Sequence, residues 1–428
     1  MGKQFLEIAE KEKVEEIVAE LSAKLAKQTA KEKAGIDEAL GRIASTDIFS
    51  VLNIPPFDRA TMDGYAVVAA DTFYTDENNP ASLIIRGYVP AGELPSQDVE
   101  SGYCLGISTG APIPKGANAV VKIENTFLDD AEIKKVKIYK PVAPNENIML
   151  AGTDIKRGER IVKEGTTLTP RETGVLAACG LNEVSVRKKP KVAIISTGNE
   201  ILVPGEDLKP GKIYDVNAQA ISDSVRDCGC VPLALGIARD NVNAISGSLK
   251  EALKRDVDVI IASGSTSAGV GDLLPNVIEE LGEIIVHGVD IKPGKPLIFG
   301  LISGKPMFGL PGNPTSALIT FNLFAAPLLR AISGIRLLEE GERRSAKAAI
   351  RIFSERGRNE YVLANLVQEN DELLAYPILS GSGAITTLSK ADGYIYMAKG
   401  KEIIEEGEMV EVKLLTNLYQ LKNRRFLS

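Results

Sequence analysis

A loop rich in glycine and hydroxyl groups has the composition of a phosphate-binding segment. Residues 263–272, SGSTSAGVGD, follow the apolar run VDVIIA and precede LLPNVIEEL, which is typical of a helix. Glycines let backbone N–H groups approach an oxyanion, and the following helix directs its positive end to the same place. The loop lacks the lysine of a Walker A motif, which disfavours an ordinary ATPase. A structural turn with Asp272 as helix N-cap explains the loop equally well, so both interpretations stay open.

Two acidic residues lie where a metal ion could bind. Glu200 follows the strand-like run AIISTG, and Asp272 ends the glycine-rich loop. We expect both at the same edge of a sheet. Mg²⁺ takes oxygen ligands, often one or two carboxylates together with phosphate oxygens. A glutamate beside a glycine is, however, more often simply solvated.

Basic and capping residues follow in two further loops. Lys292 and Lys295, in HGVDIKPGKP, suit a diphosphate, although a solvated basic turn is the commoner explanation. The segment GLPGNPTSALITF predicts a helix with Asn313 as cap, Pro314 in the first turn and Pro311 stiffening the approach. Capping alone explains this segment as well as ligand binding does.

An acid and a hydroxyl occur in two turns nearer the N-terminus. Asp63 lies in FDRATMDGYAV and Thr109 in ISTGAPIPKGANAVV. Asp63 could face Thr109, but a rigid turn without a ligand is the default explanation. His287 is the only histidine, and no nucleophile elbow is present, which disfavours a Ser-His hydrolase.

Composition limits the classes of partner. The 428 residues carry a net charge of −7, without the positive field that nonspecific nucleic-acid binding requires. The N-terminus has no signal-peptide pattern, so we expect a cytoplasmic protein. The apolar stretch 316–332 contains Asn322, Pro327 and Arg330, which favours a buried core helix over a membrane span. The four cysteines lack metal-site spacing and are interpreted as core thiols.

Periodicity predicts several elements and an α/β multidomain fold. Apolar residues at helical spacing predict a helix from Lys11 that fades after Lys33, and a shorter helix covers Asp37 to Ile43. Thr169-Pro-Arg-Glu172 reads as a capping box, with Gly180 at the helix end.

Three larger regions carry different patterns. Residues 65–142 predict a β-rich domain. A β-α-β series over about 190–333 predicts a parallel, doubly wound sheet, with ligands beyond the C-terminal strand ends. Residues 345–428 predict a small β-barrel or sandwich. We assign four domains: 1–49 with 146–188, helical and elongated; 50–145, β-rich; 189–336, doubly wound α/β; 337–428, a β-barrel.

Eight segments occur together in a specific order: PPFDRATMDGYAV, STGAPIPKGANAVV, STGNEI, GKIYDVN, SGSTSAGVGD, DIKPGKP, LPGNPTSA and GSGAITTLSKADGYI. Over nearly its whole length the chain resembles the MoeA family, the molybdopterin molybdenumtransferases that include the C-terminal domain of gephyrin. The doubly wound domain alone is also similar to molybdopterin adenylyltransferases. The MDGYAV and TGAPIP segments belong to the longer family.

The resemblance implies an enzyme of molybdenum cofactor biosynthesis. It implies a homodimer that inserts molybdate or tungstate into adenylylated molybdopterin, with Mg²⁺-dependent release of AMP. Molybdopterin adenylyltransferase and apo-molybdoenzymes are implied as protein partners, and neither nucleic acid nor a membrane is expected. The alternatives are an adenylyltransferase that consumes ATP and a noncatalytic scaffold like gephyrin.

The resemblance also implies roles for individual residues. Glu200 and Asp272 are implied as Mg²⁺ ligands, and the remaining catalytic positions are Asp63, Thr109, Asp240, Lys292 and Lys295. Asp63 and Thr109 would face the cleft across the dimer interface. The implied substrate-binding residues are Ser263, Gly264, Ser265, Thr266, Ser267, Gly269, Gly271, Pro311, Gly312, Asn313, Pro314 and Ser382.

Three positions depart from the pattern of the family. Met149 and Thr153 stand where many members have Arg and Glu, so a contact between domains or in the pocket is expected to differ. Ser265 replaces a usual glycine, which would strain a backbone that requires positive φ.

Overall fold

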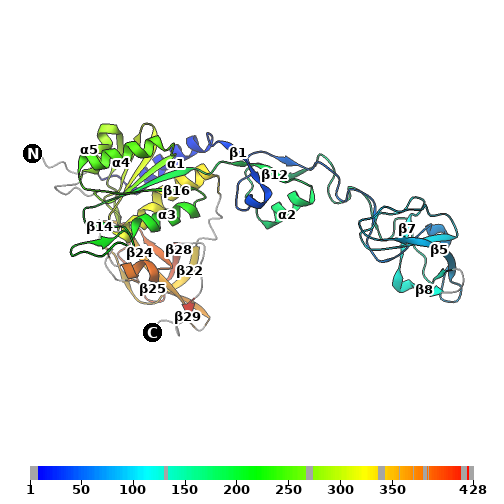
Figure 1. Ribbon diagram of the computed structural model, residues 1–428. Helices are drawn as coiled ribbons and strands as arrows, with labels where there is room; N and C mark the ends of the chain where they lie inside the picture. The colour runs from blue at the N-terminus through cyan, green and yellow to red at the C-terminus, as the bar shows by residue number, and fades with distance from the viewer. Residues whose placement is uncertain are drawn as a thin grey trace, which may run out of the picture. The chain divides into compact units, whose positions relative to one another are not determined.

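The computed structural model describes residues 8–129, 134–266, 273–335, 343–355, 357–369, 371–378, 383, 385–415 and 422–423. The chain divides into two compact units (Figure 1). Unit 1 contains Met1–Glu32 and Arg187–Ser428, and unit 2 contains Lys33–Val186. The four domain boundaries expected from the sequence remain a prediction.

A six-stranded sheet forms the centre of unit 1. Its spatial order is β16 (Val231–Ala238), β13 (Lys191–Thr197), β17 (Val259–Ser263), β21 (Lys305–Leu310), β20 (Ile298–Ile302) and β18 (Gly282–His287). The first four strands are parallel, which confirms the doubly wound prediction. Strands β20 and β18 extend the sheet in antiparallel fashion, an addition that the β-α-β pattern did not indicate.

Helices cover both faces of this sheet because its central strands are apolar on both sides. Ile194 and Ile261 pack in one core with α3 (Asn217–Asp227), α7 (Ala326–Ser333) and α1 (Lys11–Ala26). The neighbouring Ile195 and Ile260 point to the other face and pack in a second core with α4 (Val242–Lys254) and α5 (Leu274–Leu281). This alternation is the period of two expected of a strand. Figure 1 shows α3 and α4 on opposite sides of β16.

A long apolar helical stretch follows β21. It consists of α6 (Pro314–Thr320), the π-helix η4 (Phe321–Ala325) and α7. Among the described residues it is the one helix long and apolar enough to span a membrane, and 67% of its apolar window is buried inside the protein. The prediction of a buried core helix is thereby confirmed.

The C-terminal part of unit 1 is a closed five-stranded barrel, as predicted. Its strands run in the order β24 (Asn359–Glu369), β25 (Glu372–Pro377), β22 (Arg343–Ala348), β28 (Met409–Leu414) and β26 (Gly393–Met397), and β26 pairs with β24 to close it. The short strand β19 (Ile291–Lys292) also pairs with β24. The lysine-containing loop therefore joins the doubly wound domain to the barrel. Smaller elements of unit 1 are β14 (Ile201–Leu202), β15 (Ile213–Tyr214), β23 (Ile352–Phe353), β27 (Ile403–Ile404), β29 (Lys422–Asn423) and α8 (Ile385–Lys390).

A second six-stranded sheet in unit 2 confirms the β-rich prediction. Its order is β7 (Ala119–Lys122), β4 (Gly64–Val67), β6 (Tyr103–Ile107), β5 (Ala81–Val89), β9 (Lys135–Ile138) and β8 (Thr126–Asp129). Short 3₁₀ turns η2 (Ala69–Thr72) and η3 (Ile123–Asn125) connect its strands. Cores on both faces hold the sheet, one around Val136 and the other around Leu105.

The described part of unit 2 also contains three two-stranded ribbons and one α-helix. The ribbons pair β1 (Lys31–Gly35) with β12 (Glu183–Arg187), β2 (Ile48–Phe49) with β11 (Arg160–Val162), and β3 (Arg59–Ala60) with β10 (Ile148–Met149). Helix α2 (Pro170–Ala178) begins with the predicted capping box, and Gly180 has a φ of +73°. Because glycine has no Cβ atom, Gly180 adopts this left-handed conformation at the helix end without strain.

Two helix predictions near the N-terminus were wrong. The first helix begins at Lys11 as predicted but ends at Ala26, because Lys31–Gly35 pairs with β12 instead of continuing the helix. The second, predicted over Asp37 to Ile43, is only the 3₁₀ turn η1 (Ile36–Glu38). Ile43 forms a β-bridge with Thr167, so its partner lies far along the chain.

Candidate functional site

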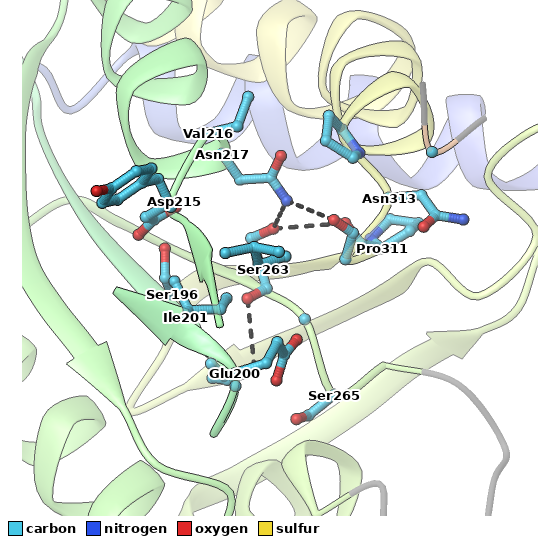
Figure 2. A pocket seen from close by; sticks show the side chains of 18 of the residues that line it. Ser196, Glu200, Ile201, Asp215, Val216, Asn217, Ser263, Ser265, Pro311 and Asn313 are labelled. Atoms are coloured by element: carbon cyan, nitrogen blue, oxygen red, sulfur yellow. Dashed lines mark hydrogen bonds between the residues drawn. The ribbon is translucent and has the colours of Figure 1, made fainter. Parts of the chain in front are cut away.

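A cavity of about 890 Å³ lies at the C-terminal ends of β13, β17 and β21 (Figure 2). This is the edge at which a doubly wound sheet generally binds its ligand. Ten predicted site residues line the cavity: Glu200, Asp240, Ser263, Gly264, Ser265, Thr266, Pro311, Gly312, Asn313 and Pro314. These residues come from four segments that are far apart in the sequence, at the ends of β13, β16, β17 and β21.

The first turn after β17 contains two residues with positive φ angles. Gly264 has a φ of +102°, and a Cβ atom at this position would lie 2.4 Å from the carbonyl oxygen of Thr197. Ser265 has a φ of +49°, which confirms that a non-glycine residue occupies a left-handed position here. Its hydroxyl donates a hydrogen bond of 2.6 Å to Asp240 Oδ1. This bond stabilises the serine in a conformation that otherwise costs energy.

Asp240 ties two loops of the cavity together. Its Oδ1 accepts from Ser265, and its Oδ2 accepts from the backbone N–H of Asn199 at 3.0 Å. A reciprocal hydrogen bond joins the same two residues, since Asn199 Oδ1 accepts from the N–H of Asp240 at 3.2 Å. The Asp240 carboxylate therefore holds the loop that carries Glu200 beside the glycine-rich loop. The exposed Glu200 side chain has no hydrogen-bond or ion-pair partner in the described part of the chain.

Asn217, which the sequence analysis gave no individual role, connects the end of β17 with the loop that follows β21. Its Nδ2 donates to Ser263 Oγ at 2.7 Å and to the carbonyl oxygen of Gly312 at 2.8 Å (Figure 2). The side chain is 9% exposed, so these bonds form away from water. The available signal was the segment GKIYDVN, in which an acid and an amide precede an amphipathic helix. Asp215 lies just before α3, and its Oδ1 accepts from the N–H of Ala218 in the first turn at 2.9 Å.

Two buried oxygen atoms in the lining lack a hydrogen-bond partner among the described residues. They are Ser196 Oγ and Asn217 Oδ1. Buried polar atoms in proteins are nearly always satisfied, by protein groups, water or a ligand. These atoms are therefore suited to a polar ligand or to bound water. Lys212, another lining residue without a predicted role, donates to the carbonyl oxygen of Asn199.

The loop after β21 leads into α6 as predicted. Asn313 is the N-cap residue and Pro314 the first helical residue. The side chain of Asn313 forms no capping hydrogen bond with the described N–H groups of α6. The helix start is therefore specified by the proline and the backbone rather than by the predicted side-chain cap.

The two predicted lysines lie outside the cavity lining, although Pro296 next to Lys295 belongs to it. Lys292 Nζ forms ion pairs with Glu355 at 3.0 Å and Glu360 at 3.1 Å. Burial alone lowers the pKa of Lys292, but the hydrogen bonds and charges of both glutamates outweigh this effect and raise the pKa. Lys292 is thus fully charged and already engaged by carboxylates of the barrel domain.

Asp63 and Thr109 lie in unit 2, where the structure brings them together. The backbone N–H of Thr109 donates to Asp63 Oδ1 at 2.8 Å, and both residues are exposed. Asp58, the other acid of that turn, accepts from the N–H of Ala151 at 2.7 Å. These contacts explain the local turn, and they leave the hydroxyl of Thr109 on the surface.

Five predicted site residues lie outside the described residues: Ser267, Gly269, Gly271, Asp272 and Ser382. Gly383 and Ile385, close to Ser382 in sequence, line the cavity. Among the residues that the structure describes, no group of three or more His, Cys, Asp or Glu side chains could hold a metal ion. The departures Met149 and Thr153 lie in unit 2, where Met149 Sδ accepts from Arg59 at 3.5 Å and Thr153 Oγ1 donates to the carbonyl of Leu150 at 2.8 Å.

The fold and the cavity define a class of protein that binds a polar ligand at the C-terminal edge of a doubly wound sheet. Three family patterns then match successive parts of the chain. They are described as "MoeA N-terminal region (domain I and II)" for residues 11–180, "Probable molybdopterin binding domain" for 193–331, and "MoeA C-terminal region (domain IV)" for 345–415. The chain belongs to the MoeA family.

Relatives of similar length support this membership. A molybdopterin biosynthesis protein of Methanocaldococcus jannaschii is 34% identical, with 94% of this chain and 96% of the relative covered. Molybdopterin molybdenumtransferase 2 of Mycobacterium tuberculosis is 33% identical over 89% and 94%, and the molybdopterin molybdenumtransferase of Bacillus subtilis is 32% identical over 91% of each chain. The chain is accordingly an enzyme of this family, which acts in molybdenum cofactor biosynthesis.

Solved structures agree over nearly the whole chain. A molybdopterin biosynthesis MoeA protein of Pyrococcus horikoshii superimposes with a TM-score of 0.81 at 41% identity, covering 96% of this chain and 100% of that one. A second structure from the same organism gives a TM-score of 0.74 at 32% identity, covering 95% and 100%. The predicted multidomain fold is confirmed by these comparisons.

Proposed function

We propose that this enzyme inserts molybdate or tungstate into adenylylated molybdopterin and releases AMP in a Mg²⁺-dependent step. The observation that carries the proposal is the cavity at the strand ends, which combines the glycine-rich turn after β17 with Glu200 and Asp240. Its volume of about 890 Å³ lies in the range of small-molecule sites, which is about 300–1,000 Å³.

The chain itself supplies positioning and polar groups. The hydroxyl of Thr266 offers a donor for phosphate oxygens, while the N–H of Gly264 and the hydroxyl of Ser263 already donate to the carbonyl oxygens of Leu310 at 3.0 Å and Pro311 at 3.4 Å. The buried oxygens of Ser196 and Asn217 can accept from donor groups of a polar heterocycle. Asp240 keeps these loops together and is a positioning residue in this account. The substrate's soft sulfur atoms, rather than protein groups, bind the molybdenum.

The donor set fits Mg²⁺. Glu200 presents a carboxylate without a partner among the described residues, and the nearby lining groups are hydroxyl and carbonyl oxygens. Mg²⁺ binds through few carboxylates and keeps water and phosphate oxygens as its other ligands. Glu200 and Asp272 remain our proposed ligands. When bound, the ion would neutralise charge on the diphosphate as it is cleaved.

Residues outside the cavity and other proteins would also take part in the proposed reaction. Asp63 and Thr109 would complete the site from a second copy of the chain in a homodimer. Lys292 and Lys295 would attract the diphosphate or oxyanion, with Lys292 exchanging its glutamate partners for substrate oxygens. We propose that the enzyme acts in the cytoplasm. Its protein partners would be a molybdopterin adenylyltransferase and apo-molybdoenzymes.

Release of AMP tests this function directly. The purified full chain is mixed with adenylylated molybdopterin and Mg²⁺, and AMP is measured before and after molybdate or tungstate is added. Release that depends on the oxyanion is expected, and the ratio of the two rates gives the preferred anion. Binding without release would instead indicate a scaffold, and ATP consumption with molybdopterin would indicate an adenylyltransferase.

A further inference from the structure

A second cavity, of about 320 Å³, lies at the opposite end of the central sheet. Lys191 begins β13, Lys305 begins β21, and Asp258 immediately precedes β17; all three line this cavity. The first cavity lies at the other ends of the same strands. The seven residues of β13 separate the two by about 20 Å, at roughly 3.3 Å per residue.

The rim of this second cavity carries uncompensated positive charge. Its lining contains four lysines, Lys188, Lys189, Lys191 and Lys305, against two carboxylates, those of Asp256 and Asp258, and Lys305 Nζ donates to the carbonyl oxygen of Val257. Lys188, Lys189 and Lys191 form no ion pair with any carboxylate in the described ranges. The Asp258 carboxylate is occupied in part, since its Oδ2 accepts from the backbone N–H of Lys191 at 2.7 Å. Many other lysines of unit 1, such as Lys347 and Lys401, pair with glutamates instead.

Part of the lining of the second cavity is apolar. Leu25, Pro190, Pro306 and Ile332 contribute to its lining, and both prolines and Ile332 are buried. The hydroxyl of Thr29 is turned to the protein, where it donates to the carbonyl oxygen of Ile332 at 2.8 Å. A lining that combines lysines with apolar side chains is complementary to a ligand with an apolar body and an anionic head. A bare inorganic anion would use only the rim.

We infer that this second cavity binds a small organic anion, with a phosphate, sulfate or carboxylate head on the lysine rim and an apolar body on the proline and leucine side. The ligand would contact both segments that connect the units, because the chain enters unit 2 after Glu32 and leaves it at Val186. These segments already meet, since the N–H of Lys188 donates to the carbonyl oxygen of Ala30 at 2.8 Å. This site is separate from the cavity of the proposed reaction.

The test is a fluorescence titration of the full chain with 8-anilinonaphthalene-1-sulfonate, an aromatic sulfonate, at low salt. The variant Lys188→Ala/Lys189→Ala removes two exposed rim lysines. The matched control, Lys250→Ala/Lys254→Ala, removes the same charge from the exposed side of α4. We expect one class of bound probe to bind about tenfold more weakly in the rim variant and with unchanged affinity in the control, since charge-assisted hydrogen bonds contribute this much.

Three outcomes would overturn the inference. They are equal affinity in the rim variant and wild type, an equal loss in rim and control variants, or no bound probe in the wild type. Oxyanion-dependent AMP release is measured on the same proteins. It is expected to be unchanged in the rim variant, and a parallel loss of AMP release would assign these lysines to the reaction itself. Failure of the proposed function in the wild type would leave the titration result standing.

Discussion

Gly264, in the turn that follows β17, occupies a position that tolerates no side chain. Its φ of +102° and the carbonyl of Thr197, 2.4 Å from a Cβ built there, both oppose any side chain. We expect Gly264→Ala to lower the free energy of unfolding by about 2 kcal/mol or more and to slow AMP release at least about tenfold. Denaturant unfolding and the AMP assay measure the two effects.

Gly247 provides the control for this substitution. It lies inside α4, and apart from the backbone of that helix no atom lies within 4 Å of a Cβ built there. Gly247→Ala should stabilise the protein by about 0.5–1 kcal/mol and leave AMP release unchanged. Wild-type activity in Gly264→Ala would contradict the assigned role of the turn.

Asn217 is the residue whose loss should separate the loops of the cavity. Replacement by alanine leaves the carbonyl of Gly312 and the hydroxyl of Ser263 without their donor, which costs about 1–3 kcal/mol. We expect Asn217→Ala to raise the KM for adenylylated molybdopterin. Asn241→Ala is the comparison, because it removes the N-cap of α4 and about 1 kcal/mol of stability. An equal rise of KM in both variants would reduce the role of Asn217 to stability alone.

Helix α2 offers a test of pH dependence at the scale of an element. The side-chain hydrogen bond from Thr169 is the main cause that lowers the pKa of Glu172 below 4.5. A lowered folded-state pKa means that the stabilisation is present above the usual pKa and is lost as pH falls through the folded-state value. Amide protection of α2, corrected for intrinsic exchange, should therefore decrease in acid below pH 4.5.

The variant Glu172→Gln serves as the matched control, because glutamine also forms a capping box but does not titrate. Its α2 protection should be independent of pH over the same range. If wild type and variant lose protection in parallel, the capping box is not the group that titrates.

The elements that the sequence predicted best are those with local causes. The capping box of Thr169 and Glu172, the start of α6 at Pro314 and the alternating strands all depend on neighbours in the chain. The end of α1 at Ala26 depends instead on the pairing of β1 with β12, about 150 residues away. Such distant partners have no signal in a single sequence.

The same distinction applies to the candidate site. Loops at strand ends placed ten predicted residues around one cavity, because parallel strands end at a common edge. The bonds of Asn217 to Ser263 and Gly312 could not be predicted, since they join three loops by side-chain geometry. Lys292 was expected to bind an anionic ligand. In the structure it forms ion pairs with two glutamates of the barrel domain, a distant segment that the sequence did not connect with it.

At the scale of the whole molecule, each unit has its own cores and should lose structure separately. Phe308 is fully buried in unit 1, and its ring centroid lies 4.8 Å from that of Phe299. Phe308→Ala should cost unit 1 about 3–5 kcal/mol and leave amide protection in unit 2 unchanged. Ile138→Ala, in a core of unit 2, should have the reverse effect. Equal loss of protection in both units would show that they unfold as one.

The central claim, that the cavity at the strand ends holds the substrate, is tested most directly by calorimetric titration with adenylylated molybdopterin. Wild type should bind one equivalent per chain. Asp240→Ala, which releases both the Asn199 and Ser265 contacts, should bind at least about tenfold more weakly while remaining folded. Unchanged affinity in the folded variant, or no binding by the wild type, would contradict the account.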